Sequence, residues 1–310
     1  MTRQRFDATS QKMNNSKPNA LTRADFRFSE RLRVRWAEID SQKIVFNGHY
    51  LMYVDTAVAG YWRALAIPYA QTMHALHGDL YVRKASLEYL ASARYDDVLD
   101  VGVKCSRVGT SSMVFTAAVF RQNELLVTGE LIYVFADPHT QTSKPVPQSL
   151  RDLFAAFEAG ERMVDVRLGT WSELKSDAQP LRTAVFVDEQ KVPAELEYDA
   201  ADEDALHAVA YNRLGQALAT GRLLTQAPNS LAGVGRIGRM ATDANMRGNA
   251  VGRQVLDALV NAAASRCDAV LLHAQVAAAN FYRRAGFVEQ GDVFEEAGIS
   301  HIEMVKHLKR

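Results

Sequence analysis

The pattern of hydrophobic and polar positions predicts a first region built from one long helix and an antiparallel meander. Apolar and polar residues alternate over 29–39, as in a strand, and apolar residues recur at helical spacing over 47–65. Pro68 is expected to close that helix, and a further helix is expected over 147–160. Four runs rich in β-branched and aromatic residues, separated by turn residues, predict the strands 80–90, 98–109, 111–122 and 125–137.

The rhythm changes near residues 160–166, where we place a domain boundary. The second region begins with a helix over 172–190 and a hairpin over 205–224 that turns near Leu214 and Gly215. Strands and helices then alternate, and the last two strands flank a turn at Ala297 and Gly298. The expected elements are a strand at 233–243, a helix at 252–267, a buried strand at 269–276, and a short helix at 277–287 with Gly286 at its C-terminal end.

Composition is ordinary for globular domains and limits the partners. The 310 residues are 48% apolar and 23% charged, which suits two cores. Lys plus Arg and Asp plus Glu both number 36, so no global field favours nucleic acid or an anionic membrane. Two cysteines are too few for a zinc site, so we expect no metal. The low cysteine count also leads us to expect a reducing cytoplasm. Residues 1–26 are polar and lack periodicity, so they are expected to form a disordered tail.

The stretch MRGNAVG, from Met246 to Gly252, is a small-residue turn between a strand and a helix. It lacks the Lys-Ser/Thr of a nucleoside-triphosphate loop and the GxGxxG of a dinucleotide fold. Backbone amides at the start of a helix have no partners and carry positive potential, so they can bind a phosphate that approaches past small residues. Taken alone, the pattern is explained equally well by an ordinary strand-to-helix turn in which glycines permit a tight backbone.

The surroundings of this turn resemble the GNAT N-acetyltransferases, whose pyrophosphate loop has the pattern Arg/Gln-x-x-Gly-x-Gly/Ala. Ala250 departs from the usual glycine. In the same family, the asparagine at the position of Asn280 contacts the cofactor, and the tyrosine at the position of Tyr282 protonates the departing thiolate. The resemblance implies an acetyl-CoA site in a domain over 165–310. Its cofactor-binding residues would be Met240, Thr242, Arg247, Gly248, Asn249, Ala250, Val251, Gly252, Arg253 and Asn280, with Tyr282 as the catalytic acid.

Acetyl transfer to an amine also requires a group that takes the proton of the nucleophile. The residues alone leave this general base open, because an isolated histidine is more often structural than catalytic. The acetyl carbonyl would rest against the amides of a splayed strand near Met240 to Thr242. The candidate bases are Glu197, Asp199, His207, His273 and His301.

The stretch that follows the first strand resembles hotdog-fold thioesterases of the 4-hydroxybenzoyl-CoA thioesterase type, with the pattern Asp-x-x-Gly-x-Val-x-His/Asn-x-x-Tyr. Lys43 replaces the glycine, and the matching positions are Asp40, Val45, Asn47 and Tyr50. Asn47 is also the nearer candidate for an N-terminal helix cap, which leaves Asp40 for chemistry. The resemblance covers about residues 28–158 and implies a hotdog domain over 27–160.

In that family, the resemblance implies Asp40 as nucleophile or general base on a thioester carbonyl. Amides at Gly48 and His49, at the start of the long helix, would stabilise the oxyanion, and Asn47 belongs to the same catalytic set. Helix packing is the alternative role of His49 and Tyr50. Asp55 is interpreted as a solvated or interchain charge.

These readings predict an α+β chain, with an N-terminal hotdog domain whose antiparallel sheet wraps a long helix and a C-terminal GNAT α/β domain. The expected function is bifunctional: hydrolysis of an acyl-CoA thioester, and acetyl transfer from acetyl-CoA to an amine acceptor, either a small molecule or a protein. The alternative is an acyl-CoA-binding oligomerisation domain fused to a single acetyltransferase or CoA sensor. Hotdog domains pair through their sheets, so a homodimer or homotetramer is expected.

Overall fold

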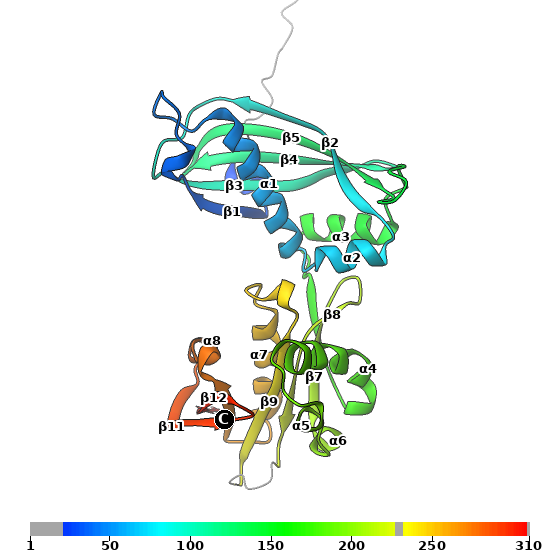
Figure 1. Ribbon diagram of the computed structural model, residues 1–310, viewed down its shortest axis with the longest axis vertical. Helices are drawn as coiled ribbons and strands as arrows, with labels where there is room; N and C mark the ends of the chain where they lie inside the picture. Colours follow the sequence, from blue (N-terminus) through cyan, green and yellow to red (C-terminus); the bar gives the residue numbers. More distant parts are fainter. Residues whose placement is uncertain (1–20, 227–231, 309–310) are drawn as a thin grey trace, which may run out of the picture.

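The computed structural model describes residues 21–226 and 232–308 and places them in two units along one long axis (Figure 1). Residues 1–20 of the predicted tail lie outside the described residues. The end of that tail is structured, however: Arg23–Asp25 form a 3₁₀ turn, η1, and Arg23 pairs with Asp100 at 2.9 Å. Phe26 is buried against Phe120, so this segment belongs to the first unit. Within the described residues, no helix has the length and apolarity to cross a bilayer.

The N-terminal unit is one antiparallel sheet of five strands in the order β1-β3-β4-β5-β2, crossed by a single long helix (Figure 1). The predicted meander is confirmed, and α2, which the sequence did not predict, begins after Pro68. The elements are β1 (Phe28–Arg33), η2 (Trp36–Glu38), α1 (Asn47–Ala64), α2 (Tyr69–Ala75), β2 (Asp79–Tyr89), β3 (Val98–Val108), β4 (Ser112–Arg121), β5 (Glu124–Ala136) and α3 (Gln148–Glu158).

Helix α1 forms because its apolar residues fall on one face, which packs into the curve of the sheet. Tyr61 and Trp62 are buried on this face and contact Phe115 of β4 and Phe154 of α3 through edge-to-face and stacked rings. The predicted strand over 29–39 is shorter than expected, because β1 ends at Arg33 and the chain turns into η2.

The C-terminal unit is a seven-stranded sheet in the order β11-β12-β10-β9-β8-β7-β6. Its predicted strands and helices are confirmed, and the short elements β6, α5 and α6 are additional. The elements are β6 (Val164–Gly169), α4 (Trp171–Arg182), η3 (Thr183–Glu189), α5 (Ala194–Glu197), α6 (Ala201–Asp204), β7 (Leu206–Asn212), β8 (Ala217–Leu224), β9 (Val234–Thr242), η4 (Ala244–Met246), α7 (Val251–Ala263), β10 (Ala269–Gln275), η5 (Val276–Ala278), α8 (Ala279–Arg284), β11 (Val288–Glu296) and β12 (Ile299–His307).

Alternating residues of β7 show how the two main helices cover this sheet. Ala208 and Ala210 belong to the core cluster that includes α7, whereas Val209 and Tyr211 pack with Trp171 of α4. Because successive side chains of a strand point to opposite faces, α7 and α4 lie on opposite sides of the sheet.

The two units meet where α1 ends and α7 begins. The Arg63 guanidinium donates to the Arg247 carbonyl at 2.9 Å, and the Asn249 side chain donates to the Arg63 carbonyl at 2.8 Å. Asn212, at the end of β7, donates to the Ala66 carbonyl at 3.0 Å. The helix at the centre of the first unit therefore contacts the turn that precedes α7 in the second.

Candidate functional site

The central feature of the second unit is a pair of parallel strands that separate. Strands β9 and β10 pair only from Val234 to Arg236, opposite Ala269 to Leu271. Beyond that point a cavity of about 450 Å³ opens, lined by Ile237–Met240 on β9 and by Leu272, His273 and Gln275 on β10. Separated strands present backbone amides that no neighbouring strand uses, which suits the binding of a ligand carbonyl.

A bulge in β9 lies at this cavity. Thr220 pairs with Ala241 and Arg222 with Gly238, so two residues of β9 face one of β8. One of the two, Arg239, has a φ of 53°, which is the left-handed region. The bulge redirects the backbone at Arg239 and Met240, both of which line the cavity.

The turn before α7 offers unpartnered backbone donors. Asn249 donates its amide to the Met246 carbonyl. Among the described residues, no acceptor pairs with the amides of Gly248, Ala250, Val251, Gly252 or Arg253. Helix α7 has 13 residues, so its dipole adds positive potential at this end. The backbone is therefore arranged to receive an anion.

Side chains around the turn are already engaged with other groups. Arg247 forms a two-pronged ion pair with Glu189, at 2.7 and 2.6 Å, which lowers the pKa of Glu189. Arg253 pairs with Asp257 one helical turn later, at 2.9 Å. The positive charge available to an anion at this turn thus comes mainly from the backbone amides.

Ala250, which stands where the family pattern has a glycine, adopts a backbone conformation that glycine favours. It caps the start of α7 with φ 58° and ψ 8°, a left-handed conformation that disfavours any residue with a Cβ. The turn keeps its shape at a local conformational cost of about 1–2 kcal/mol, offset by the packing of the helix that follows.

Tyr282 lines the same cavity from α8. It is buried, and burial raises the pKa of its phenol to about 12, so the hydroxyl keeps its proton at neutral pH. Asn280 lies two residues earlier, is exposed, and accepts a hydrogen bond from Arg283. Gly286 follows α8 with a φ of 87°, as expected of a helix-ending glycine.

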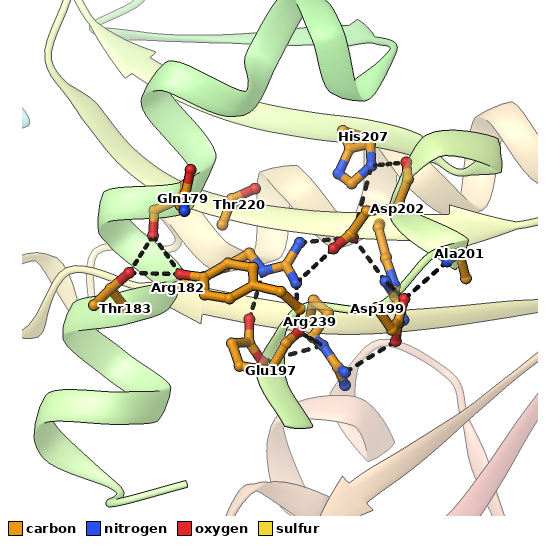
Figure 2. Close-up of polar contacts among 12 residues, drawn as sticks. Gln179, Arg182, Thr183, Glu197, Asp199, Ala201, Asp202, His207, Thr220 and Arg239 are labelled. Atoms are coloured by element: carbon orange, nitrogen blue, oxygen red, sulfur yellow. Dashed lines mark hydrogen bonds and ion pairs between the residues drawn. The ribbon is translucent and has the colours of Figure 1, made fainter. Parts of the chain in front are cut away.

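An ionic network lies beside the cavity, and four of its members line it: Glu197, Asp199, Arg222 and Arg239. Figure 2 shows the polar contacts of this network. Arg182 is only 1% exposed and donates to Glu197 at 2.5 Å and to Asp202 at 2.7 and 3.0 Å. Arg222 bridges Asp199 and Asp202, at 2.7 Å to each, and Arg239 reaches Glu197 at 3.1 Å. Three guanidinium groups therefore meet three carboxylates, and four of the six are buried: Arg182, Glu197, Asp202 and Arg222.

The five candidate bases fall into two groups. His207 is buried behind the network, its Nε2 lies 2.9 Å from the Asp202 carbonyl oxygen, and burial lowers its pKa. It does not line the cavity, whereas Glu197, Asp199, His273 and His301 do. Burial raises the pKa of Glu197, while hydrogen bonds from Arg222 lower the pKa of Asp199.

A second candidate site lies in the first unit, at the loop that precedes α1. Asp40 is half-buried in this loop rather than at the end of a strand. The Asp40 amide donates to the Ile44 carbonyl, and Ile39 bridges to Val45, so the loop folds back on itself. Lys43 adopts a φ of 61° there, which is the conformation that the family's glycine would take without strain.

Glu38 anchors this loop, a role that no motif in the sequence indicates. Its side chain is buried and accepts hydrogen bonds from the Tyr53 hydroxyl at 2.6 Å and the Arg35 amide at 2.7 Å. Burial works to raise the pKa of Glu38, but these hydrogen bonds outweigh it and lower the pKa. The Glu38 carbonyl also accepts from the Phe46 amide, which ties the Asp40 loop to the start of α1.

The start of α1 differs from the predicted cap. Phe46 is the N-cap residue and no side chain caps the helix, so the prediction that Asn47 serves as the cap is wrong; Asn47 is the first helical residue. The His49 amide donates to the Phe46 carbonyl, whereas no described residue accepts from the Gly48 amide. The His49 Nδ1 atom is buried without any partner among the described residues. A buried polar atom without a hydrogen bond is costly, so it is suited to a ligand or partner group.

Asp55 lies on the exposed face of α1, as interpreted from the sequence. It borders an apolar cavity between the units whose lining includes Trp62, Tyr133 and Asn245. Asp55 contributes to raising the pKa of the Tyr133 phenol, although burial of that phenol is the larger cause.

Comparison with known proteins assigns each unit to a family. The model of the GNAT acetyltransferase domain matches residues 174–308, and that of the thioesterase superfamily matches residues 42–128. The chain therefore belongs to the GNAT acetyltransferase family in its C-terminal part and carries a thioesterase superfamily domain of hotdog type in its N-terminal part. Domains of both kinds bind CoA-type molecules.

Relatives of each unit are separate proteins. An uncharacterised N-acetyltransferase of Bacillus subtilis, YjcF, is 34% identical over 136 residues, which are 43% of this chain and 93% of YjcF. The acyl-CoA thioester hydrolase YbgC of Escherichia coli is 28% identical over 120 residues, 38% of this chain and 89% of YbgC. A Thermus thermophilus thioesterase solved with coenzyme A and zinc is 24% identical, covers 44% of this chain and 96% of its own, and has a TM-score of 0.39.

Proposed function

We propose that the chain is a bifunctional CoA-dependent enzyme, which hydrolyses an acyl-CoA thioester in its first unit and transfers an acetyl group from acetyl-CoA to an amine in its second. The observation that carries the proposal is the combination of unpartnered amides before α7 with the cavity between β9 and β10. A diphosphate at the turn and a thioester in the cavity use both features at once. The match to two CoA-using families supports it.

For acetyl transfer, the diphosphate of acetyl-CoA accepts hydrogen bonds from the amides of Gly248 and Ala250–Arg253. The thioester oxygen lies against the bulge at Met240, where backbone amides polarise the carbonyl. The amine nitrogen attacks the carbonyl carbon, the carbon–sulfur bond breaks, and Tyr282 gives its proton to the leaving thiolate. Glu197 is the strongest candidate to take the amine proton, because it lines the cavity and burial raises its pKa.

Substituting Tyr282→Phe tests the role of the acid. We expect kcat for acetyl transfer to fall by roughly 100-fold while the Kd of acetyl-CoA stays within twofold, because only the proton donor is lost. Tyr211→Phe is the matched control, since Tyr211 is also buried but lies outside the cavity lining, where its hydroxyl donates to Asp177 at 2.7 Å. Equal rates for the two variants over a panel of amine acceptors would remove Tyr282 from the mechanism.

For thioester hydrolysis, Asp40 acts either as a nucleophile, whose acyl adduct is then hydrolysed by water, or as a general base that takes a proton from the attacking water. In both cases the carbon–sulfur bond breaks, the CoA thiolate leaves and takes up a proton, and the carboxylic acid is released. The Gly48 amide donates to the developing oxyanion, and the buried His49 Nδ1 meets the bound thioester. The hydrogen bonds of Glu38 position the Asp40 loop against α1. Asn47 lies in the first turn of α1 and belongs to the same catalytic set.

Measuring free thiol from a panel of acyl-CoAs tests this site. Asp40→Asn keeps the side-chain shape and is expected to lower kcat by at least 100-fold with an unchanged Tm. Asp55→Asn, which changes an exposed carboxylate on the neighbouring helix α1, is expected to retain activity. If wild type and Asp40→Asn hydrolyse equally slowly, the first unit is an acyl-CoA-binding module; if only Asp55→Asn is inactive, the catalytic carboxylate is misassigned.

We also propose that the first unit pairs with a second copy through β2. This strand is at one edge of the sheet and exposes Tyr81, Val82 and Tyr89 to solvent. A long exposed apolar edge is usually covered by another strand. Sedimentation of the full chain is expected to give a homodimer or homotetramer, and the substitution Val82→Arg is expected to shift the chain toward monomer. A wild-type chain that sediments as a monomer contradicts the pairing.

The proposed setting of the protein is cytoplasmic, with no nucleic-acid or membrane partner.

A further inference from the structure

A cavity of about 400 Å³ lies where the two units join, and its walls come from four segments far apart in the sequence. Arg27 precedes β1, Arg63 lies at the end of α1, Arg162 lies between the units, and Asn249 and Gln254 flank the start of α7. Three guanidinium-bearing residues thus line one cavity. Because both units contribute to it, neither could form the cavity alone.

The charge in this cavity is unbalanced. Among its described lining residues there is no aspartate or glutamate, and in the described part of the chain none of the three arginines forms an ion pair. Arg63 donates only to the Arg247 carbonyl, and Arg27 donates to the carbonyls of Phe157 and Glu161. The Arg162 guanidinium has no partner within the described residues.

Backbone carbonyls near the cavity do not supply the missing negative charge. The Arg63 carbonyl accepts from Asn249 at 2.8 Å, and the Ala66 carbonyl accepts from Asn212 at 3.0 Å. The Arg162 carbonyl accepts from Arg213 at 3.3 Å. Each of these three carbonyls already accepts one hydrogen bond, whereas the Arg162 guanidinium donates to no described residue, and the positive end of α7 is adjacent.

We infer that the arginines of this junction bind a phosphate or diphosphate group in a cavity that adjoins the backbone turn before α7 and shares Asn249 with it. Guanidinium groups donate in a planar fork that matches phosphate oxygens. The group is either part of a separate phosphorylated small molecule or the 3′-phosphate of the CoA bound at the neighbouring turn. The inference goes beyond the proposed function and does not require either unit to be catalytically active.

Calorimetric titration of the full chain with sodium pyrophosphate tests the site, with and without saturating CoA. Arg162→Gln removes the unpartnered guanidinium, and Arg266→Gln is the control. It deletes the same charge from an exposed residue past the end of α7, roughly 20 Å from the cavity along the helix. Thermal unfolding is expected to be the same for both variants and wild type.

Each arm has a defined result. If wild type binds pyrophosphate in the presence of CoA and Arg162→Gln binds about tenfold more weakly, the site takes a separate phosphorylated molecule. If CoA abolishes pyrophosphate binding, and Arg162→Gln weakens CoA but not 3′-dephospho-CoA by about tenfold, the group is the 3′-phosphate of CoA. If Arg162→Gln and Arg266→Gln behave alike in every titration, the inference is overturned.

Discussion

Replacing Arg182 by methionine should destabilise the C-terminal unit strongly, because it removes one charge from the buried network of Figure 2. Methionine approximates the length of the aliphatic stem but carries no donor. Glu197 loses its 2.5 Å partner, and Asp202 loses two hydrogen bonds at 2.7 and 3.0 Å. Both carboxylates have side chains only 3% exposed, so water does not replace the lost donors.

The magnitude follows from charge balance. With Arg182 present, three guanidinium groups face three carboxylates; without it, two remain, and one buried negative charge is uncompensated. Removing one partner of a buried ion pair typically costs about 3–5 kcal/mol, and we expect a loss in that range. Loss of a cation raises the pKa of both carboxylates in the folded state, adding to the raised pKa that burial already gives Glu197.

The sign of the pH dependence follows. A carboxylate whose pKa is higher in the folded than in the unfolded state binds protons more tightly when folded, so stability falls as pH rises through the folded value. The deficit of Arg182→Met relative to wild type is therefore largest at pH 7–8, and it shrinks toward pH 5. Glu197→Gln in the same chain removes one unpaired charge and should restore about 1–3 kcal/mol.

Native-state hydrogen exchange, read by mass spectrometry on peptides from β7 and β8, gives the opening free energy of this unit separately from the first. Arg266→Met is the matched control, because Arg266 is exposed, and its effect should stay within about 0.5 kcal/mol. A change below about 1 kcal/mol for Arg182→Met, or a deficit that grows as pH falls, would refute the argument.

Two left-handed residues give the remaining predictions. Ala250→Gly should relieve the strain at φ 58° and raise Tm slightly, by the equivalent of about 0.5–1 kcal/mol, with CoA affinity unchanged or increased; a weaker Kd in calorimetry would show that the methyl group itself supports the turn. Lys43→Gly should likewise stabilise the Asp40 loop by up to about 1 kcal/mol and should not slow thioester hydrolysis; a lower Tm would mean that the Lys43 side chain makes a stabilising contact.

Periodicity sufficed for the main elements because their buried faces are regular. Strands β3 to β5 and helices α1 and α7 each bury an apolar stripe, and that stripe is visible as spacing along the chain. Short elements such as α5 and α6 have four residues each, too few to show a period. Helix α1 ends before Pro68, as expected, but the sequence pattern does not show that Pro68 also precedes a second helix, α2, as its N-cap residue.

The ionic network could not be predicted from the sequence, because its members lie far apart along the chain. Five separate elements supply its members: α4, α5, α6, β8 and β9 contribute Arg182, Glu197, Asp202, Arg222 and Arg239. Each of these residues is of a type that usually lies on the solvated surface. Only the tertiary fold brings them together. The start of α1 is a similar case: tertiary hydrogen bonds, from Val45 to Ala93 and from Phe46 to Glu38, fix where the helix begins, so Asn47 does not cap it.

The central claim, that the bare amides before α7 bind the diphosphate of CoA, is tested most directly by hydrogen–deuterium exchange of the peptide that spans residues 246–254. In the free protein these amides should exchange within seconds, because most have no acceptor. Saturating CoA should protect several of them, and CoA without the diphosphate, as pantetheine, should not. Calorimetric binding of CoA with unchanged exchange across 246–254 would contradict the account.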